Sequence, residues 1–146
     1  MNPITVHTAG ADHLEELAVM NKQLIEDEQH DNPMNIEQLQ ARMAGFIEGH
    51  YSAYLFKQDG ELRGYALVDH ARKSLYLRQF FIMRESRRGG LGTLAFTALL
   101  NHLGTGQIDI EVMFWNERGY RFWRSLGFQE RSFYMRLDGA QVGQDR

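Results

Sequence analysis

One stretch of this chain, residues 75–103, constrains the fold more than any other. It begins with an apolar, strand-like run at 75–83, passes through a polar loop that holds Gly89, Gly90 and Gly92, and enters an amphipathic helix. The first turn of a helix leaves backbone N–H groups without internal partners and carries roughly half a positive charge. Glycine lets an anion approach these amides, because no Cβ stands in the way. A strand, a glycine loop and a helix in this order predict a phosphate-binding site.

The loop is compatible with more than one kind of site. No Gly-Lys-Ser/Thr follows the glycines, which excludes a Walker loop. Residues 90–95 read Gly-x-Gly-x-x-Ala, and Asp109 or Glu111 follows about 20 residues later, as in a dinucleotide-binding fingerprint. That motif follows its strand more tightly than Gly90 follows Met83. A nucleotide-dependent oxidoreductase and a plain solvated loop both stay open as alternatives.

Length and composition narrow the class of protein. The 146 residues suit one domain, 1–146, with 138–146 as a flexible tail. A net charge of −3 lacks the basic excess of a nucleic-acid-binding protein. The chain has no cysteine, which excludes thiol catalysis and disulfides, and its six histidines show no metal-ligand spacing, so no metal site is predicted. No apolar run approaches the ~20 residues of a membrane span, and no secretion signal is present, so a cytoplasmic protein without a membrane partner is expected.

The remaining patterns predict alternating strands and helices. Asn35 and Gln38 form a capping box before a helical stripe, and Asp59-Gly60 is a hairpin signal between two apolar runs. A helix between the strands near 80 and 110 makes those two strands parallel. The order is expected to be a strand (4–7), helices (14–28 and from 36), strands (51–56, 62–68, 75–83), a helix (90–103), a strand (108–115), a short helix after 116 and a last strand (128–137).

Two motifs in this order resemble one known family. Residues 87–92, Arg-Arg-Gly-Gly-Leu-Gly, fit Arg/Gln-x-x-Gly-x-Gly, which resembles the acetyl-CoA pyrophosphate loop of the GNAT (GCN5-related) N-acetyltransferases. The strand at 108–115 is followed by Asn116, a short helix with the aromatic pair Phe122-Trp123, and Leu-Gly-Phe at 126–128, which is similar to the second signature of the family.

The resemblance implies an α/β (α+β) fold and an enzyme. The expected sheet is mixed and mostly antiparallel, with six to seven strands, a splayed parallel pair and about four flanking helices. The implied activity is an N-acetyltransferase that uses acetyl-CoA as co-substrate and no metal. The primary amine of a small molecule, or an exposed amino group, would attack directly in a ternary complex. Relatives often dimerise, so a homodimer is a candidate assembly.

The resemblance also assigns cofactor-binding residues. Backbone N–H groups from Arg88 through Thr93 are the expected pyrophosphate donors, with the Thr93 hydroxyl as one more. Main-chain groups at the end of the preceding strand would hold the pantetheine arm and polarise the thioester carbonyl. The full cofactor-binding set is Phe81, Ile82, Met83, Arg87, Arg88, Gly89, Gly90, Leu91, Gly92, Thr93, Asn116 and Trp123.

The proton donor departs from the family pattern. Many relatives carry tyrosine where this chain has Trp123, and an indole N–H does not titrate. Tyr120 lies three residues earlier on the same helical face and is the nearest substitute as catalytic acid. A thiol with a pKa near 8.5 also leaves without an acid. The departure keeps open a second function, a catalytically weak CoA-binding regulatory module.

The acceptor residues are the least defined. The nearest subgroup is the spermidine/spermine (diamine) acetyltransferases, whose strand reads Leu-Tyr-Leu-Glu-Asp-Phe-Phe where this chain has Arg78-Gln79 in place of the two acids. Arg78 would repel a polycation or bind an acidic group. Glu28 matches an acidic acceptor-side residue of that subgroup, and it ends an acidic run that opposes the helix dipole. Glu28 and Arg78 are therefore the predicted substrate-binding residues.

Overall fold

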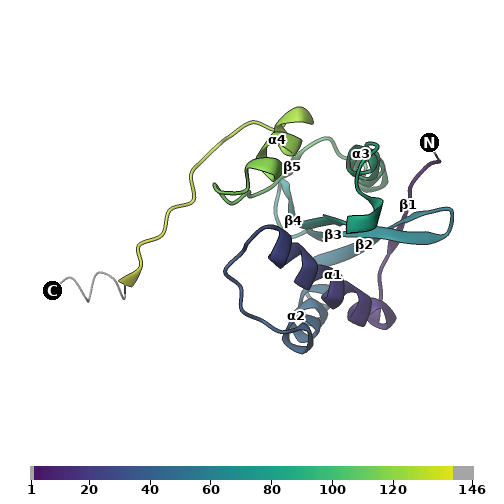
Figure 1. The fold of residues 1–146 in the computed structure, drawn as a ribbon, viewed down its shortest axis with the longest axis horizontal. Coiled ribbons are helices and arrows are strands. Elements are labelled where there is room, and N and C mark those ends of the chain that lie inside the picture. Colours follow the sequence, from purple (N-terminus) through teal and green to yellow (C-terminus); the bar gives the residue numbers. More distant parts are fainter. Residues whose placement is uncertain (1, 140–146) are drawn as a thin grey trace.

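The computed structural model describes residues 2–139 and contains one five-stranded sheet with strand order β1-β2-β3-β4-β5 (Figure 1). The first four strands are antiparallel neighbours, and β5 lies parallel to β4. The strands are β1 (Thr5–Thr8), β2 (Tyr51–Gln58), β3 (Glu61–Asp69), β4 (Leu75–Ile82) and β5 (Ile108–Asp109). The helices are α1 (Leu14–Asp27), α2 (Ile36–Glu48), α3 (Leu91–Leu103) and α4 (Glu117–Ser125), with short 3-10 turns at Ala11–His13 and Arg84–Ser86.

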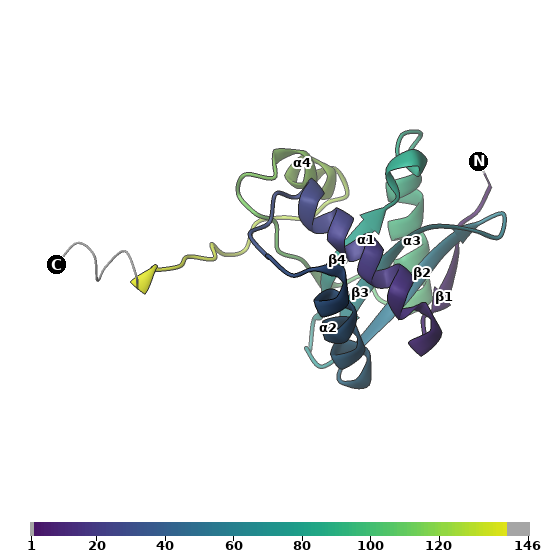
Figure 2. The same ribbon diagram turned by 60° about the horizontal axis from the view of Figure 1, so that its bottom comes forward.

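Helices cover both faces of the sheet, with α1 and α2 on one face and α3 on the other (Figures 1 and 2). Successive side chains of a strand point to opposite faces, and β3 shows how this builds two cores. Tyr65 and Leu67 pack with α1 and α2, whereas Ala66 and Val68 pack with α3. Burial on both sides in this way explains why residues 64–68 of β3 form an uninterrupted apolar run.

Several local predictions are confirmed. Asn35 Oδ1 accepts from the Gln38 N–H at 2.8 Å, and Gln38 Oε1 accepts from the Asn35 N–H at 2.9 Å, so the capping box starts α2. Asp59 and Gly60 both have positive φ, as the β2–β3 hairpin requires. Gly104 ends α3 in the left-handed conformation.

The number of strands differs from the expectation of six to seven, because the last predicted strand does not pair. Within the described chain, β5 is only two residues long, and residues 128–137 belong to no strand. They extend away from the folded body in both views (Figures 1 and 2). A strand needs a neighbour to satisfy its backbone groups, and this segment has none within residues 2–139. The four expected helices are present, and the predicted tail lies mostly outside the described residues.

A bulge interrupts the pairing of β3 with β4. Leu67 lies opposite Gln79 and Val68 lies opposite Leu77, so Arg78 is the extra residue. Gln79 is consequently buried, and its side chain accepts a hydrogen bond from the Tyr65 hydroxyl at 2.8 Å.

Among the described helices, none is both long enough and apolar enough to cross a membrane.

Candidate active site

The parallel strands β4 and β5 part almost as soon as they meet. Their pairing is limited to Leu75 with Ile108 and Tyr76 with Asp109. Beyond this point β4 continues to Ile82, while residues 110–115 continue without a ladder to it. One edge of β4 is therefore unpaired over its second half, and its backbone groups face a gap that an extended ligand could fill as a strand does.

The backbone direction of β4 decides which groups face that gap. Met83 donates its N–H to Arg63 O at 2.8 Å, and Phe81 lies opposite Tyr65 in the antiparallel ladder. Backbone groups alternate in direction along such a ladder, so those of Phe81 and Met83 point to β3 and those of Ile82 point to the gap. The expectation that all three residues offer main-chain groups to a cofactor arm is therefore corrected for Phe81 and Met83.

The backbone N–H groups at the N-terminus of α3 have no side-chain cap. Gly90 is the N-cap, with φ of 82°, and no side chain caps the helix. Within residues 2–139, no protein group accepts a hydrogen bond from the amides of residues 90–93. A Cβ added to Gly90 would meet nothing within 4 Å, so space is open beside it. Such amides, with the helix dipole, form a site for an anion. Leu91 is buried beneath this turn, whereas Gly89, Arg88 and Thr93 are exposed.

Gly92 has a packing role that its motif does not reveal. A Cβ at Gly92 would lie 3.2 Å from two ring atoms of Phe122, so its absence lets the first turn of α3 approach α4. Trp123, next along α4, packs edge-on against Phe80 and Phe96, with ring centroids 5.3 and 5.4 Å apart. Trp123, which is partly buried, therefore holds α4 to α3 and β4, and its predicted contact with the cofactor stays a prediction.

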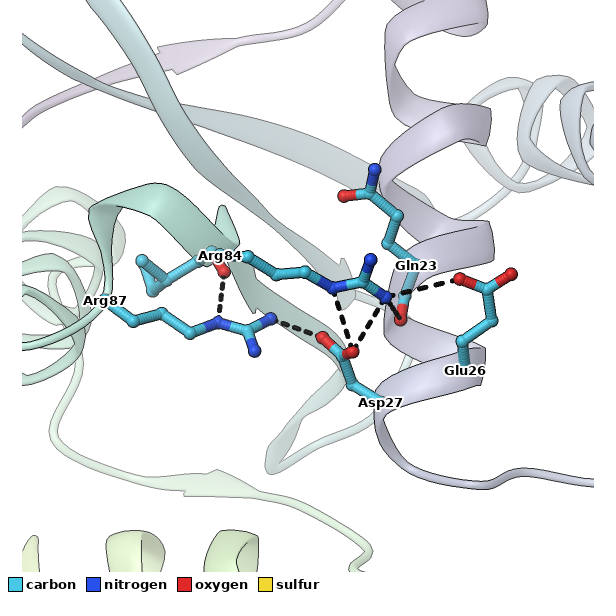
Figure 3. A network of polar contacts seen from close by, with 6 residues as sticks. Gln23, Glu26, Asp27, Arg84 and Arg87 are labelled. Atoms are coloured by element: carbon cyan, nitrogen blue, oxygen red, sulfur yellow. Dashed lines mark hydrogen bonds and ion pairs between the residues drawn. The ribbon is translucent and has the colours of Figure 1, made fainter.

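Arg87, the first residue of the glycine motif, is tied to protein groups (Figure 3). Its Nε donates to Ile82 O at 2.8 Å, and its guanidinium donates to Asp27 at 2.5 Å. Arg84 donates to the other carboxylate oxygen of Asp27 at 2.8 Å and to Glu26 at 3.2 Å. Burial alone would raise the pKa of Asp27, but the hydrogen bonds from Arg87 and Arg84 lower it below its usual range. The two arginines thus fix the end of α1 beside the end of β4, and Arg87 is a structural link.

A pocket of the described chain adjoins this link. It has a volume of about 420 Å³ and lies between the end of α1 and the start of α4, with an open mouth. The Trp115 indole donates to Glu28 O at 3.0 Å and connects the two sides. The residues that line the pocket come from two segments. The first segment supplies Asp27, Glu28 and Gln29, and the second supplies Trp115, Asn116, Glu117, Arg118 and Arg121.

Glu28 is the chemically distinctive residue of this pocket. It is half-buried, and within the described residues its carboxylate accepts no hydrogen bond. Burial, and then the negative charge of Asp27, raise the pKa of Glu28 to about 7. A carboxylate with this pKa exchanges a proton near neutral pH, as a general base must. Glu28, predicted from the sequence to bind the substrate, thus lines this pocket, and its role toward an acceptor stays a prediction.

Asn116 and Tyr120 lie on α4 but differ in their surroundings. Asn116 caps α4, because its Oδ1 accepts from the Gly119 N–H at 3.0 Å, and it also lines the pocket. Tyr120 is 43% exposed and lies one turn before Trp123 on the same helical face. Its hydroxyl has no hydrogen-bond partner in the described residues, and it is not among those that line the pocket.

Arg78 lies apart from this pocket. Its guanidinium lies 4.9 Å from the centre of the Phe46 ring and donates to the Tyr51 hydroxyl at 3.3 Å. These partners place it against α2 and β2, on an exposed position of the bulge.

In the described residues, no cluster of histidine, aspartate or glutamate has an arrangement that could hold a metal ion.

Sequence reasoning missed Asp27, Trp115, Arg118 and Arg121. The available signal was the acidic run at the end of α1, whose charges oppose the helix dipole. No local pattern could show that 27–29 meets 115–121, because these segments are far apart in the sequence and only the fold joins them.

Comparisons with known proteins identify a matching family model and solved structures with a similar fold. The family model for the acetyltransferase (GNAT) family matches residues 13–128. The structure is similar to that of a possible acetyltransferase from Clostridium difficile 630, with a TM-score of 0.74 at 16% identity, covering 93% of this chain and 97% of that one. A predicted acetyltransferase from Clostridium acetobutylicum, solved with acetyl-CoA, has a TM-score of 0.68 at 14% identity, with 94% and 97% covered.

A third similar structure is the aminoglycoside N-acetyltransferase AAC(6')-Iy in complex with CoA, with a TM-score of 0.67 at 17% identity, covering 94% of this chain and 96% of that one. Among curated proteins, none matches this sequence. The structural neighbours establish a shared fold, and the matched family model covers most of the chain.

Proposed function

The chain belongs to the acetyltransferase (GNAT) family, and we propose that it transfers an acetyl group from acetyl-CoA to the primary amine of a small molecule. The observation that carries this proposal is the gap between β4 and β5, which opens beside the bare N-terminus of α3. Acetyl-CoA has a diphosphate for the amides of residues 90–93 and an extended arm for the free edge of β4.

The residues that hold the cofactor act through their main chain. The amides of Gly90, Leu91 and Thr93 bind the pyrophosphate, since they have no other acceptor. The Ile82 N–H faces the gap and donates to the thioester carbonyl, where it stabilises the negative charge that develops on oxygen. Arg88 and the Thr93 hydroxyl, both exposed at the loop, add polar groups for the phosphates.

Glu28 supplies the base for the acceptor. An amine is mostly protonated at neutral pH and must lose a proton before it attacks. Glu28 takes that proton, the amine nitrogen bonds to the acetyl carbon, and the carbon–sulfur bond breaks to release CoA thiolate. Tyr120, one helical turn from the core residue Trp123, is the proposed donor of a proton to the thiolate. The proposed transfer takes place in one ternary complex, and the lack of cysteine closes an acyl-enzyme route through that residue.

The acceptor is a small amine that is not a polyamine. The pocket of about 420 Å³ is of a size for a small molecule. Arg118 and Arg121 line it on the α4 side, and the diamine subgroup's acidic pair is replaced by Arg78 and the buried Gln79. Arg121 donates to Glu117 at 2.6 Å, so its charge is balanced, whereas Arg118 disfavours a polycation and Glu28 favours a single ammonium group.

A thiol-release assay with acetyl-CoA and a panel of small amines tests this function. We expect turnover with a monoamine that exceeds the rate with spermidine. CoA binding without turnover on any acceptor would favour the regulatory module, for which Trp123 in place of tyrosine is the motivating observation. Thermal stabilisation by NAD and not by CoA would contradict both readings.

A further inference from the structure

A chain of hydrogen bonds crosses the interior between α1, α2 and the sheet. Arg42 Nη2 donates to Asn21 Oδ1 at 3.3 Å, and the Tyr65 hydroxyl donates to Gln79 Oε1 at 2.8 Å. Burial and then the charge of Glu28 raise the pKa of Tyr65 well above its usual range. The charge of Arg42 and a hydrogen bond from Asn21 lower this pKa, which means that Asn21 donates to the phenolic oxygen. One buried network thus joins side chains of α1, α2, β3 and β4.

The chain of hydrogen bonds has one direction, which its first member sets. A guanidinium has donors only, so the Asn21 carbonyl oxygen faces Arg42 and the Asn21 amide nitrogen faces Tyr65. The Tyr65 oxygen accepts this bond, and its own hydrogen goes to Gln79 Oε1. The Gln79 amide therefore turns its oxygen toward Tyr65 and its nitrogen, with two N–H groups, away from it.

The amide nitrogen of Gln79 is a donor without a partner. Within residues 2–139, no protein group accepts a hydrogen bond from it. In the same residues, the fully buried polar side-chain atoms that lack a partner are Arg63 Nε and Ser74 Oγ. Gln79 Nε2 is not one of them, so it keeps contact with solvent and a ligand can reach it. A donor that is already held in one orientation binds a ligand without a further loss of side-chain freedom.

The bulge of β4 places this donor beside the proposed acceptor. Leu77 packs in the core beneath α3, whereas Gln79 bonds Tyr65 in the core beneath α1 and α2. Residues two apart in a regular strand share a face, so the extra residue Arg78 moves Gln79 to the other face. Gln79 also lies in the half of β4 whose edge is unpaired. The charge of Glu28 acts on the same Tyr65 hydroxyl, so the donor and the proposed base lie close together.

We propose that Gln79 Nε2 donates a hydrogen bond to an oxygen atom of the acceptor, a hydroxyl or a carbonyl, and so determines which amines are acetylated. This inference rests on the proposed function. An acceptor with a methylene group at the same place leaves the donor unpaired, and one with a second ammonium group is repelled. The preferred substrates are therefore amines that carry an oxygen near the reacting nitrogen, such as amino alcohols and amino amides.

Matched pairs of amines test this preference. Ethanolamine and n-propylamine have the same shape and differ in one oxygen, and glycinamide is similarly matched by isobutylamine. The preference is the ratio of kcat/KM for the amine with oxygen to kcat/KM for its match. In Gln79→Met, which keeps the length of the side chain but has no donor, we expect the ratio of one or both pairs to fall about tenfold.

Two further variants guard this test. Gln79→Glu keeps an acceptor for the buried Tyr65 hydroxyl and loses the donor, so the ratio should fall in this variant too. The control Gln107→Met makes the first change at an exposed position after α3 and should leave the ratio unchanged. Circular dichroism melting shows whether each variant is folded. Ratios that are the same for both pairs in wild type, Gln79→Met and Gln79→Glu overturn the proposal.

Tyr65 is a positioning residue in this scheme, and a double-mutant comparison tests it. Tyr65→Phe lets the Gln79 amide turn over, so the ratio should fall. In the Gln79→Met background the same change should leave the ratio as it is, because no donor remains to be oriented. A fall of equal size in both backgrounds would contradict the hydrogen-bonded chain, since Tyr65 would then act through packing alone.

Binding without acetyl-CoA separates this inference from the proposed function. The side-chain amide signals of Gln79 in a heteronuclear NMR spectrum are identified by their loss in Gln79→Met. We expect glycinamide or ethanolamine to shift them, and isobutylamine and n-propylamine to leave them in place. If they shift and no amine is acetylated, the donor site stands and the proposed function fails. If amines are acetylated and these signals stay in place with every amine, this inference alone fails.

Discussion

The two halves of the candidate site are built in different ways. The cofactor half comes from one contiguous stretch, β4 through α3, and offers mainly backbone amides. The acceptor half joins the end of α1 to the start of α4 and offers side chains, above all Glu28. A main-chain site depends on local conformation, whereas a side-chain site depends on the identity of a few residues. Substitutions should therefore separate cofactor binding from catalysis.

Removing the acceptor-side base should have the largest effect. Glu28→Gln keeps the shape of the side chain but cannot take a proton. We expect kcat/KM to fall by about 10²–10⁴-fold, the usual contribution of a general base, with the Kd for CoA unchanged. Steady-state kinetics and calorimetry measure the two quantities. The control Glu16→Gln makes the same change at an exposed position of α1 and should leave both unchanged. Equal activity of the two variants would remove Glu28 from the mechanism.

The same residue should weaken the fold at high pH. The pKa of Glu28 is about 7 in the folded chain and 4.5 as a reference value. A raised carboxyl pKa means that the folded state binds the proton more tightly, so stability falls as pH rises from about 4.5 to 7 and then levels off. The free energy of unfolding of Glu28→Gln should therefore exceed that of wild type by up to about 3 kcal/mol at pH 8 and differ little from it at pH 4. Denaturant unfolding at both pH values measures this difference.

A single methyl group should disturb the cofactor half. Gly90→Ala places a Cβ on a left-handed residue beside the proposed pyrophosphate amides. We expect roughly a tenfold rise in the Kd for CoA, equivalent to about 1.4 kcal/mol, and a stability loss of about 1 kcal/mol from backbone strain. Gly106→Ala, at a glycine with open space and no positive φ, is the matched control. An unchanged Kd in Gly90→Ala would place the cofactor elsewhere.

The smallest expected effect links the two halves. Asp27→Asn removes the negative charge that raises the pKa of Glu28, so the rise of kcat/KM with pH should move to lower pH. The control Glu26→Gln also removes a contact to Arg84 but keeps the Asp27 charge. A pH profile that shifts equally in both variants would mean that the Asp27 charge does not act on Glu28.

The same division explains what the sequence could predict. The capping box at Asn35, the hairpin at Asp59-Gly60 and the helix that starts at Gly90 are local patterns, and the structure confirms all three. Arg87 resembles a cofactor residue in its local motif, yet its guanidinium binds Asp27, which lies 60 residues away. The partner of such a side chain depends on how distant segments pack.

Trp123 and the last strand show the same limit. The position of Trp123 in the motif suggests the cofactor, but its ring completes an aromatic cluster with Phe80, Phe96 and Phe128. The alternation in 128–137 predicts a last strand, but the structure has none there, because an alternating pattern cannot supply a pairing partner. Strand propensity is local, whereas pairing is a property of the assembled sheet.

Amide hydrogen exchange with and without acetyl-CoA tests the central claim most directly. If the gap beside β4 holds the arm and α3 holds the pyrophosphate, saturating acetyl-CoA slows exchange at Ile82 and at residues 90–93, and leaves the amides of Phe81 and Met83, already paired with β3, unchanged. Equal exchange at these amides in the two conditions, in a chain that calorimetry shows to have bound acetyl-CoA, would contradict it.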